Sequence, residues 1–207
     1  MTPDDVLDFW FAGVTEDVAA AGERMSVWFQ SDATFDAEVN QQFAAAIAPA
    51  AGGEYSEWAR SARECLALVI MLDQFPRNVY RGSAEAFNYD ALALGLTIVG
   101  LKLGYLEELE PIEQVFFLMP YQHVEDLQKQ QEGFALFERI AAESSAEWQP
   151  LLGGCRDFAN VHLEIIEQFG RFPHRNEALR RQSTEAEQAY LQQGGESFGQ
   201  NRNQGGG

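Results

Sequence analysis

Apolar residues recur along most of the chain at the three- and four-residue spacing of amphipathic helices. Phe35, Val39 and Phe43 follow this spacing, and so do Ile165 and Phe169 further along. No stretch alternates convincingly between apolar and polar positions, as a half-buried strand does. The pattern therefore predicts an all-α fold of about eight helices, and we expect neighbouring helices to pair into antiparallel hairpins.

Three helix starts carry clear capping signals. Thr2 precedes Pro3, and proline is favoured at the first helical position because the amide hydrogen it lacks would have no partner there. Asp32 precedes an amphipathic run, and Thr184 forms a capping box with Glu187. These signals predict helices that begin directly after Thr2, Asp32 and Thr184.

Proline and glycine predict where several helices end. The residue before a proline is disfavoured in the α conformation, so Pro76 should end a helix at Phe75 and Pro120 should close another. We also expect a helix to end near Pro49, and we expect the Gly153–Gly154 pair to form a turn.

Length and composition favour a single domain. The chain has 207 residues, of which 46% are hydrophobic, and this is enough to build one substantial core. We assign residues 1–193 to one helical domain. Residues 194–207 are rich in Gly, Gln and Asn, and we expect them to form a flexible tail.

Charge and sequence signals exclude several classes of protein. The chain carries 32 acidic and 14 basic residues, a net charge of −18, which disfavours binding to nucleic acids. No apolar run approaches the roughly 20 residues that span a bilayer, and Met1–Asp5 lacks the basic residues of a secretory signal. Cys65 and Cys155 are far apart and show no metal-binding pattern. We expect a soluble cytoplasmic protein with neither a membrane nor a nucleic-acid partner, and the oligomeric state stays open.

An aromatic-proline-arginine sequence occurs twice. Residues 73–78 read Asp-Gln-Phe-Pro-Arg-Asn and are called the first motif; residues 170–176 read Gly-Arg-Phe-Pro-His-Arg-Asn and are called the second motif. Arginine is suited to bidentate contacts with carboxylates and phosphates. Six of the 14 basic residues lie within or just after the two motifs: Arg77, Arg81, Arg171, Arg175, Arg180 and Arg181.

One interpretation of the motifs is structural. Arg77 and Arg175 follow predicted helix ends, where free carbonyls and the helix dipole attract cations. Asp73 then pairs with one of these arginines in a partly buried network that fixes the helix packing. On this interpretation the two motifs are helix-terminating ion-pair networks.

The other interpretation is a ligand site. All three histidines of the chain, His123, His162 and His174, lie on or near the motifs, so we predict a shared cavity. His123 is the candidate catalytic acid or base near neutral pH, with Glu125 or Asp126 orienting it. The ligand is predicted to be a small anion, a carboxylate or a phosphate. The residues predicted to bind it are Arg77, Asn78, Arg81, His162, Arg171, His174, Arg175 and Asn176.

No cofactor is predicted, and catalysis stays open. His123 and Asp126 share a helix face and His162 would add a nitrogen ligand, yet no His-Glu-x-x-His spacing is present, and we predict no metal. Neither cysteine lies beside a histidine in sequence, and no Gly-x-Ser-x-Gly turn occurs. An enzyme that depends on histidine, with or without a metal, is therefore an alternative to simple binding.

The chain resembles a bacterial family of uncharacterised all-helical proteins, described as tetratricopeptide-like and without an established activity. The resemblance covers Val6 to Leu191 and rests on both motifs and on segments such as Asp8–Phe11 and Trp28–Phe29. Arg180 stands where the family pattern has Gly. The resemblance implies a right-handed array of helical hairpins, and such arrays capture peptides, often through a carboxylate.

Three arrangements would separate these interpretations. A small enclosed cavity where histidine and arginine side chains converge favours a metabolite site, whereas an open groove lined by Asn, Arg and aromatic residues favours peptide capture. An interior in which every arginine is paired argues against both. The aromatic residues Trp10, Phe11, Trp28 and Phe29 are expected to pack in the core.

Overall fold

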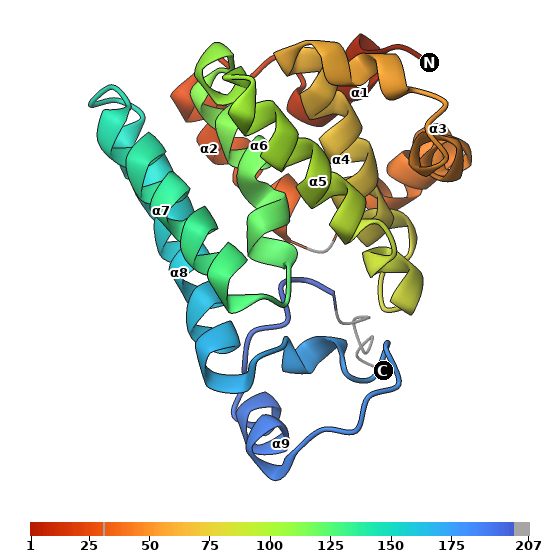
Figure 1. The fold of residues 1–207 in the computed structure, drawn as a ribbon, viewed down its shortest axis with the longest axis vertical. Helices are drawn as coiled ribbons and strands as arrows, with labels where there is room; N and C mark the ends of the chain where they lie inside the picture. The colour runs from red at the N-terminus through yellow and green to blue at the C-terminus, as the bar shows by residue number, and fades with distance from the viewer. Residues whose placement is uncertain (31, 201–207) are drawn as a thin grey trace.

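The computed structural model describes residues 1–30 and 32–200, and this part of the chain contains helices and connecting loops without strands (Figure 1). The all-α prediction is confirmed. The α-helices are α1 (Pro3–Phe11), α2 (Val18–Phe29), α3 (Ala33–Ala51), α4 (Ala62–Val79), α5 (Asp90–Lys102), α6 (Pro111–His123), α7 (Leu127–Glu143), α8 (Gln149–Phe169) and α9 (Glu185–Gln192). The shorter 3₁₀-helices are η1 (Ser56–Arg60), η2 (Ala84–Phe87), η3 (Tyr105–Glu108) and η4 (Pro173–Arg175).

Helix α4 lies at the centre of the fold. It packs against α1, α3, α5 and α6, and every residue from Cys65 to Arg77 is buried. Most of this stretch is apolar on all sides, which suits a helix surrounded by protein. The exceptions are Asp73, Gln74 and Arg77, and with them the first motif enters the core.

Consecutive helices pack side by side in two hairpins, α3 with α4 and α7 with α8. The α7–α8 pair extends along one side of the molecule (Figure 1), and α7 also packs against α6. Gly133 of α7 permits the contact with α6, because a Cβ at this position would lie 2.5 Å from the Cβ of Tyr121. The right-handed tetratricopeptide-like superhelix stays a prediction.

Aromatic side chains near the N-terminus belong to the core, as predicted. Trp10, Phe11 and Trp28 are almost fully buried, and Phe29 is partly buried against the same cluster. The indole N–H of Trp28 donates to the carbonyl of Trp10 at 3.0 Å, and its ring packs edge-on against Phe116. These side chains join α1 and α2 to α6.

The three predicted helix starts are confirmed. Thr2 and Thr184 form capping boxes with Asp5 and Glu187. Asp32 accepts hydrogen bonds from two amides in the first turn of α3, at 2.7 and 3.2 Å. Each cap satisfies amides that would otherwise have no partner at the helix end.

The helix ends predicted at Phe75 and Pro120 are wrong, whereas the end predicted near Pro49 is confirmed, because α3 ends at Ala51. Helices α3, α4 and α6 continue through Pro49, Pro76 and Pro120 and end two or three residues later. Each proline lies in a last turn, where it removes one hydrogen bond and the neighbouring helices hold the backbone in place. The first motif is therefore part of α4. The Gly153–Gly154 pair, predicted as a turn, is also helical and lies inside α8.

The described part of the C-terminal segment packs against the helices, in contrast to the expected flexible tail from residue 194. The ring of Phe198 stacks on the ring of His162 with a centroid distance of 3.8 Å, and Gln200 is buried. Arg81 donates a hydrogen bond to the carbonyl of Gly199. One aromatic side chain thus holds a glycine-rich stretch in place, while residues 201–207 lie outside the described residues.

Arg180 has a left-handed backbone conformation, with φ of 53°. A residue with a Cβ pays about 1–2 kcal/mol in this conformation, and glycine loses about 0.5–1 kcal/mol more chain entropy than alanine on folding. We expect Arg180→Gly to raise the free energy of unfolding by about 0.5–1 kcal/mol, measured by urea denaturation. Arg180→Ala removes the same side chain and keeps the strain, so an equal gain in that variant would contradict this explanation.

Candidate functional site

Asp73 places a carboxylate in the middle of the helical core. Its side chain is 0% exposed, and an unpaired charge there would be very costly. Nδ1 of His123 lies 2.8 and 3.0 Å from the two carboxylate oxygens, and Gln74 and Arg77 make further contacts. Burial alone would raise the pKa of Asp73, but its contacts with His123 and Arg77 and the hydrogen bond from Gln74 hold it below its usual value. Asp73 is therefore ionised.

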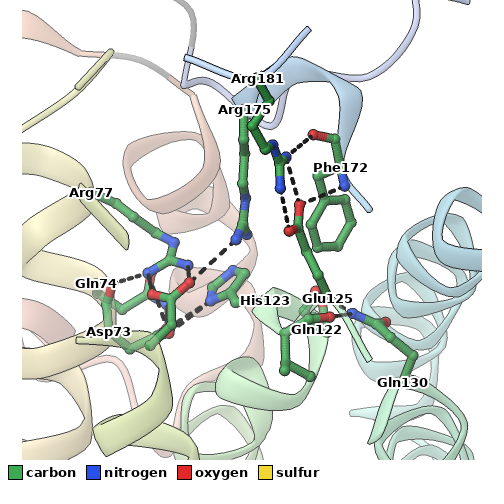
Figure 2. Close-up of polar contacts among 12 residues, drawn as sticks. Asp73, Gln74, Arg77, Gln122, His123, Glu125, Gln130, Phe172, Arg175 and Arg181 are labelled. Atoms are coloured by element: carbon green, nitrogen blue, oxygen red, sulfur yellow. Dashed lines mark hydrogen bonds and ion pairs between the residues drawn. The ribbon is translucent and has the colours of Figure 1, made fainter. Parts of the chain in front are cut away.

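Arg77 and Arg175 bring the two motifs together (Figure 2). Arg77 donates to both oxygens of Asp90 at 2.8 and 2.9 Å, and to a backbone carbonyl of α4 at 2.6 Å. Arg175 donates to Asp90 at 3.3 Å and lies between the rings of Phe87 and Phe172, 4.4 and 4.5 Å from their centroids. Burial lowers the pKa of Arg175 to about 10, so both guanidinium groups carry a charge at neutral pH.

His123 is held as a neutral ring with one nitrogen unengaged. Burial and the charge of Arg77 lower the pKa of His123 below 6.5, and Asp73 only partly offsets them. A carboxylate accepts hydrogen bonds and cannot donate them, so the neutral ring keeps its proton on Nδ1, facing Asp73. Nε2 then carries a lone pair and has no hydrogen-bond partner within the described part of the chain. A general base needs this protonation state and this orientation.

A small cavity lies in front of His123. Its volume is about 50 Å³, which gives room for one or two water molecules. His162 of α8 lines the same cavity, and the two imidazole centroids are 6.2 Å apart. The other polar residues in its wall include Gln74, Arg77, Asn78 and Arg81. The structure thus brings together two histidines and two arginines that the sequence singled out, and their role in binding stays a prediction.

Arg81 and Asn78 reach the cavity while Asp36 of α3 holds them. Arg81 donates to the two oxygens of Asp36 at 2.6 and 2.7 Å, and Asn78 donates to the same carboxylate at 2.8 Å. The remaining terminal nitrogen of Arg81, Nη1, donates to the carbonyl of Gly199. Through Nη1, Arg81 therefore contacts a neutral backbone oxygen of the C-terminal segment.

Glu125 and Asp126 do not orient His123, contrary to the sequence-based expectation. Glu125 accepts hydrogen bonds from Arg181 at 2.6 and 2.9 Å and from a backbone amide of the second motif at 2.7 Å (Figure 2). Asp126 caps α7 by accepting from an amide of its first turn. Helix α6 ends at His123 and the chain turns away, so the neighbouring carboxylates point elsewhere and Asp73 of α4 takes their place.

The polar residues of the second motif, Arg175 included, lie outside the cavity wall. Arg171 donates to both oxygens of Glu187 at 2.6 and 2.7 Å, and the side chain of Asn176 is engaged within its own loop at 2.9 and 3.0 Å. His174 lines a larger hollow of about 1190 Å³ instead. The structure therefore does not bring Arg171, His174 and Asn176 to His123.

Most arginines near the motifs are paired with carboxylates, and this supports a structural role for them as a group. Five of the six have such partners: Arg77 and Arg175 with Asp90, Arg81 with Asp36, Arg171 with Glu187, and Arg181 with Glu125. Sequence reasoning missed Asp36 and Asp90. Both lie in the first turn of a helix, where acidic residues are common, so no local signal marked them.

Both cysteines are buried thiols of low reactivity. Burial raises the pKa of Cys65 to about 11 and that of Cys155 to about 12, so both thiols are neutral and poor nucleophiles. Among residues 1–30 and 32–200, no group of three or more His, Cys, Asp or Glu is placed to hold a metal ion. No helix in this same portion is long and apolar enough to cross a membrane.

Comparisons with known proteins match nearly the whole chain. The model of a bacterial protein family of unknown function, DUF924, matches residues 6–195. A solved structure of a protein of unknown function, ATU0120 from Agrobacterium tumefaciens, is 36% identical in sequence and has a TM-score of 0.76. That match covers 92% of this chain and 97% of the other. No curated protein matches the chain significantly, so the comparisons give a family and a fold without an activity.

The buried histidines predict a loss of stability in mild acid. Burial holds the pKa values of His162 and His174 well below 6.5, and that of His123 below 6.5. The rings are neutral in the folded protein and become charged in the unfolded chain below about pH 6.5. Protons then favour unfolding, so this stability is complete above pH 6.5 and falls as the pH decreases, by up to about 1.4 kcal/mol per pH unit for each ring.

Urea denaturation at pH 7.5 and pH 5.5 tests this expectation. The wild-type protein should lose stability at pH 5.5, and His162→Gln should lose less because its side chain does not titrate. A variant that retains the full pH dependence would contradict the assignment to His162.

Proposed function

The chain belongs to the DUF924 family of bacterial proteins of unknown function, and we propose that it binds a small anionic ligand, bearing a carboxylate or a phosphate, in the cavity in front of His123. His123 acts as a base toward a proton-bearing group of this ligand. One observation carries the proposal: Asp73 orients His123 through Nδ1, and His123 lines a cavity together with Arg77 and Arg81.

The pairing of Asp73 with His123 supports the role as a base. The ring is neutral at neutral pH because burial and Arg77 lower its pKa, so Nε2 accepts a proton without first losing one. After proton transfer the imidazolium would lie 2.8 Å from the carboxylate of Asp73, and that negative charge stabilises it. A carboxylate behind a histidine thus fixes both its tautomer and its direction.

Arg81 supports the choice of an anion. Besides Asp36, Arg81 contacts the neutral carbonyl of Gly199, and a carboxylate or phosphate oxygen is a stronger acceptor because the bond then joins two charged groups. Asp36 holds Arg81 and Asp90 holds Arg77. Because both guanidinium groups are already fixed, binding would cost little side-chain entropy.

A ligand larger than one or two water molecules must displace the C-terminal segment. Phe198 and Gln200 form part of the cavity wall, and the ring of Phe198 covers His162. An anion that takes the place of the Gly199 carbonyl on Arg81 removes one of the contacts that hold this segment. Ligand binding and release of residues 198–200 are therefore coupled in this proposal.

Peptide capture is the second candidate function, and the hollow of about 1190 Å³ favours it. This hollow lies between η2 and the loop after η4, and Phe87, His174, Asn176 and Arg180 contribute to its wall. Arg180 is exposed, as a residue that receives a peptide carboxylate would be. Binding at this place would not depend on His123 or Arg81, which line the other cavity.

A thermal-shift screen with inorganic phosphate, succinate, citrate and glucose 6-phosphate tests the proposed site. At a concentration of 100 times its dissociation constant, a ligand stabilises the protein by about 2.7 kcal/mol. We expect at least one probe to raise the melting temperature of the wild-type protein. Arg81→Gln and His123→Gln should lower that shift by at least half, measured relative to the unliganded melting temperature of each variant.

Arg156→Gln is the matched control, since Arg156 pairs with Asp157 on the exposed face of α8 and the variant has the same net charge as Arg81→Gln. It should keep the full ligand-induced shift. If no probe stabilises the wild-type protein, or if Arg156→Gln loses the shift as well, the proposal is wrong and the network around Asp73 has a purely structural role.

A further inference from the structure

An apolar compartment adjoins the cavity of His123. Its volume is about 340 Å³, within the range of about 300–1,000 Å³ that is typical of small-molecule sites. Its walls come from α2, α6 and α8, and they are formed mainly by apolar side chains such as Met25, Phe29, Val115, Met119 and Phe158. The compartment is several times larger than the cavity of about 50 Å³ beside it.

The compartment and the cavity share part of their walls. Phe29 of α2, Met119 of α6 and Phe158 of α8 border both spaces. Methionine is flexible and repacks at low cost, so Met119 does not form a rigid barrier between them. One molecule can therefore have a polar end beside His123 and an apolar end between α2 and α8.

Gln122 gives the compartment a polar group. The residue is only 3% exposed, and its side-chain oxygen has no hydrogen-bond partner in residues 1–30 and 32–200. A buried amide oxygen without a partner is costly, so it retains the capacity to accept a hydrogen bond from an O–H or N–H group of a ligand. Cys155 lines the same space as a neutral thiol, because burial raises its pKa to about 12, and it acts as an apolar wall.

We infer that the ligand is an amphipathic organic anion. Its charged group lies in the cavity of His123 and Arg81, and an aliphatic or aromatic part fills the compartment between α2, α6 and α8. An O–H or N–H group of the part in the compartment donates to the side-chain oxygen of Gln122. This inference rests on the proposed function for the charged end and adds the chemical class of the other end.

Isothermal titration calorimetry with acetate, butanoate, hexanoate and octanoate tests the apolar end. Each methylene that enters the compartment should increase the affinity of the wild-type protein about fourfold, from the transfer free energy of one buried CH₂. The 1-alkanols of the same length should show the same gain per methylene with weaker binding overall. Affinities that do not rise with chain length, or no binding of octanoate at millimolar concentration, would overturn the inference.

Gly154→Leu tests the place of the apolar end. Gly154 lies in the wall of the compartment, and a Cβ there meets no atom within 4 Å, so a side chain can begin at this position without a clash. In this variant the affinity should no longer rise with chain length, while the affinity for acetate should equal that of the wild-type protein. Gly153→Leu is the control, because Gly153 is equally unobstructed and does not line the compartment. An unchanged gain in Gly154→Leu would count against this location.

Two further variants keep the outcomes distinct. If circular dichroism shows that Gly154→Leu does not fold, Ser26→Leu makes the same test from the α2 wall of the compartment. Arg81→Gln should lower the affinity for the carboxylates and leave the affinity for the 1-alkanols unchanged. If carboxylates and alkanols bind with equal affinity and the affinity still rises with each methylene, the assignment of the charged end is wrong, and so is the proposed function. If carboxylates bind more tightly than alkanols but the affinity does not rise with chain length, only the inference about the apolar end is overturned.

Discussion

The structure depends on keeping the carboxylate of Asp73 ionised inside a helical core. A buried ion without compensation costs several kcal/mol. His123 from α6 and Arg77 from the next turn of α4 compensate it by pairing with the carboxylate. Arg77 requires Asp90 in turn, and Asp90 also receives Arg175 from the second motif. These groups form one connected unit, in which the loss of Asp73 would leave His123 without its hydrogen-bond partner and the loss of Asp90 would leave Arg175 without its carboxylate.

Features with a local cause could be predicted from the sequence. The helix caps at Thr2, Asp32 and Thr184 were predicted because the capping side chain and the amides it satisfies are adjacent in the chain. The position of Arg180, which has a left-handed backbone conformation, was singled out by the family resemblance, which has Gly there. The prolines were misjudged, because the packing of α4 against its neighbours holds the turn around Pro76 in a helical conformation that an isolated segment would not keep.

The partners in the candidate site could not be predicted, because they are set by the packing of distant segments. Scarce histidines and clustered arginines pointed to a common region, but neither Asp73 as the partner of His123 nor Asp90 as the partner of two arginines has a signature in its own neighbourhood. The docking of residues 195–200 could not be predicted either, because it depends on the packing of segments that are distant in the sequence. Only the folded surface around His162 shows that a lone Phe198 has a place to pack.

The sequence separations in the network also determine when it forms during folding. The contact of Asp73 with His123 joins residues 50 positions apart, and the contact of Asp90 with Arg175 joins residues 85 positions apart. The hairpins of α3 with α4 and of α7 with α8 close much shorter loops and lose less chain entropy. We therefore expect the hairpins to form first, and the polar network to close when α5, α6 and the second motif dock around α4. In this order Asp73 stays hydrated until its partners arrive, so the chain does not bury this charge alone.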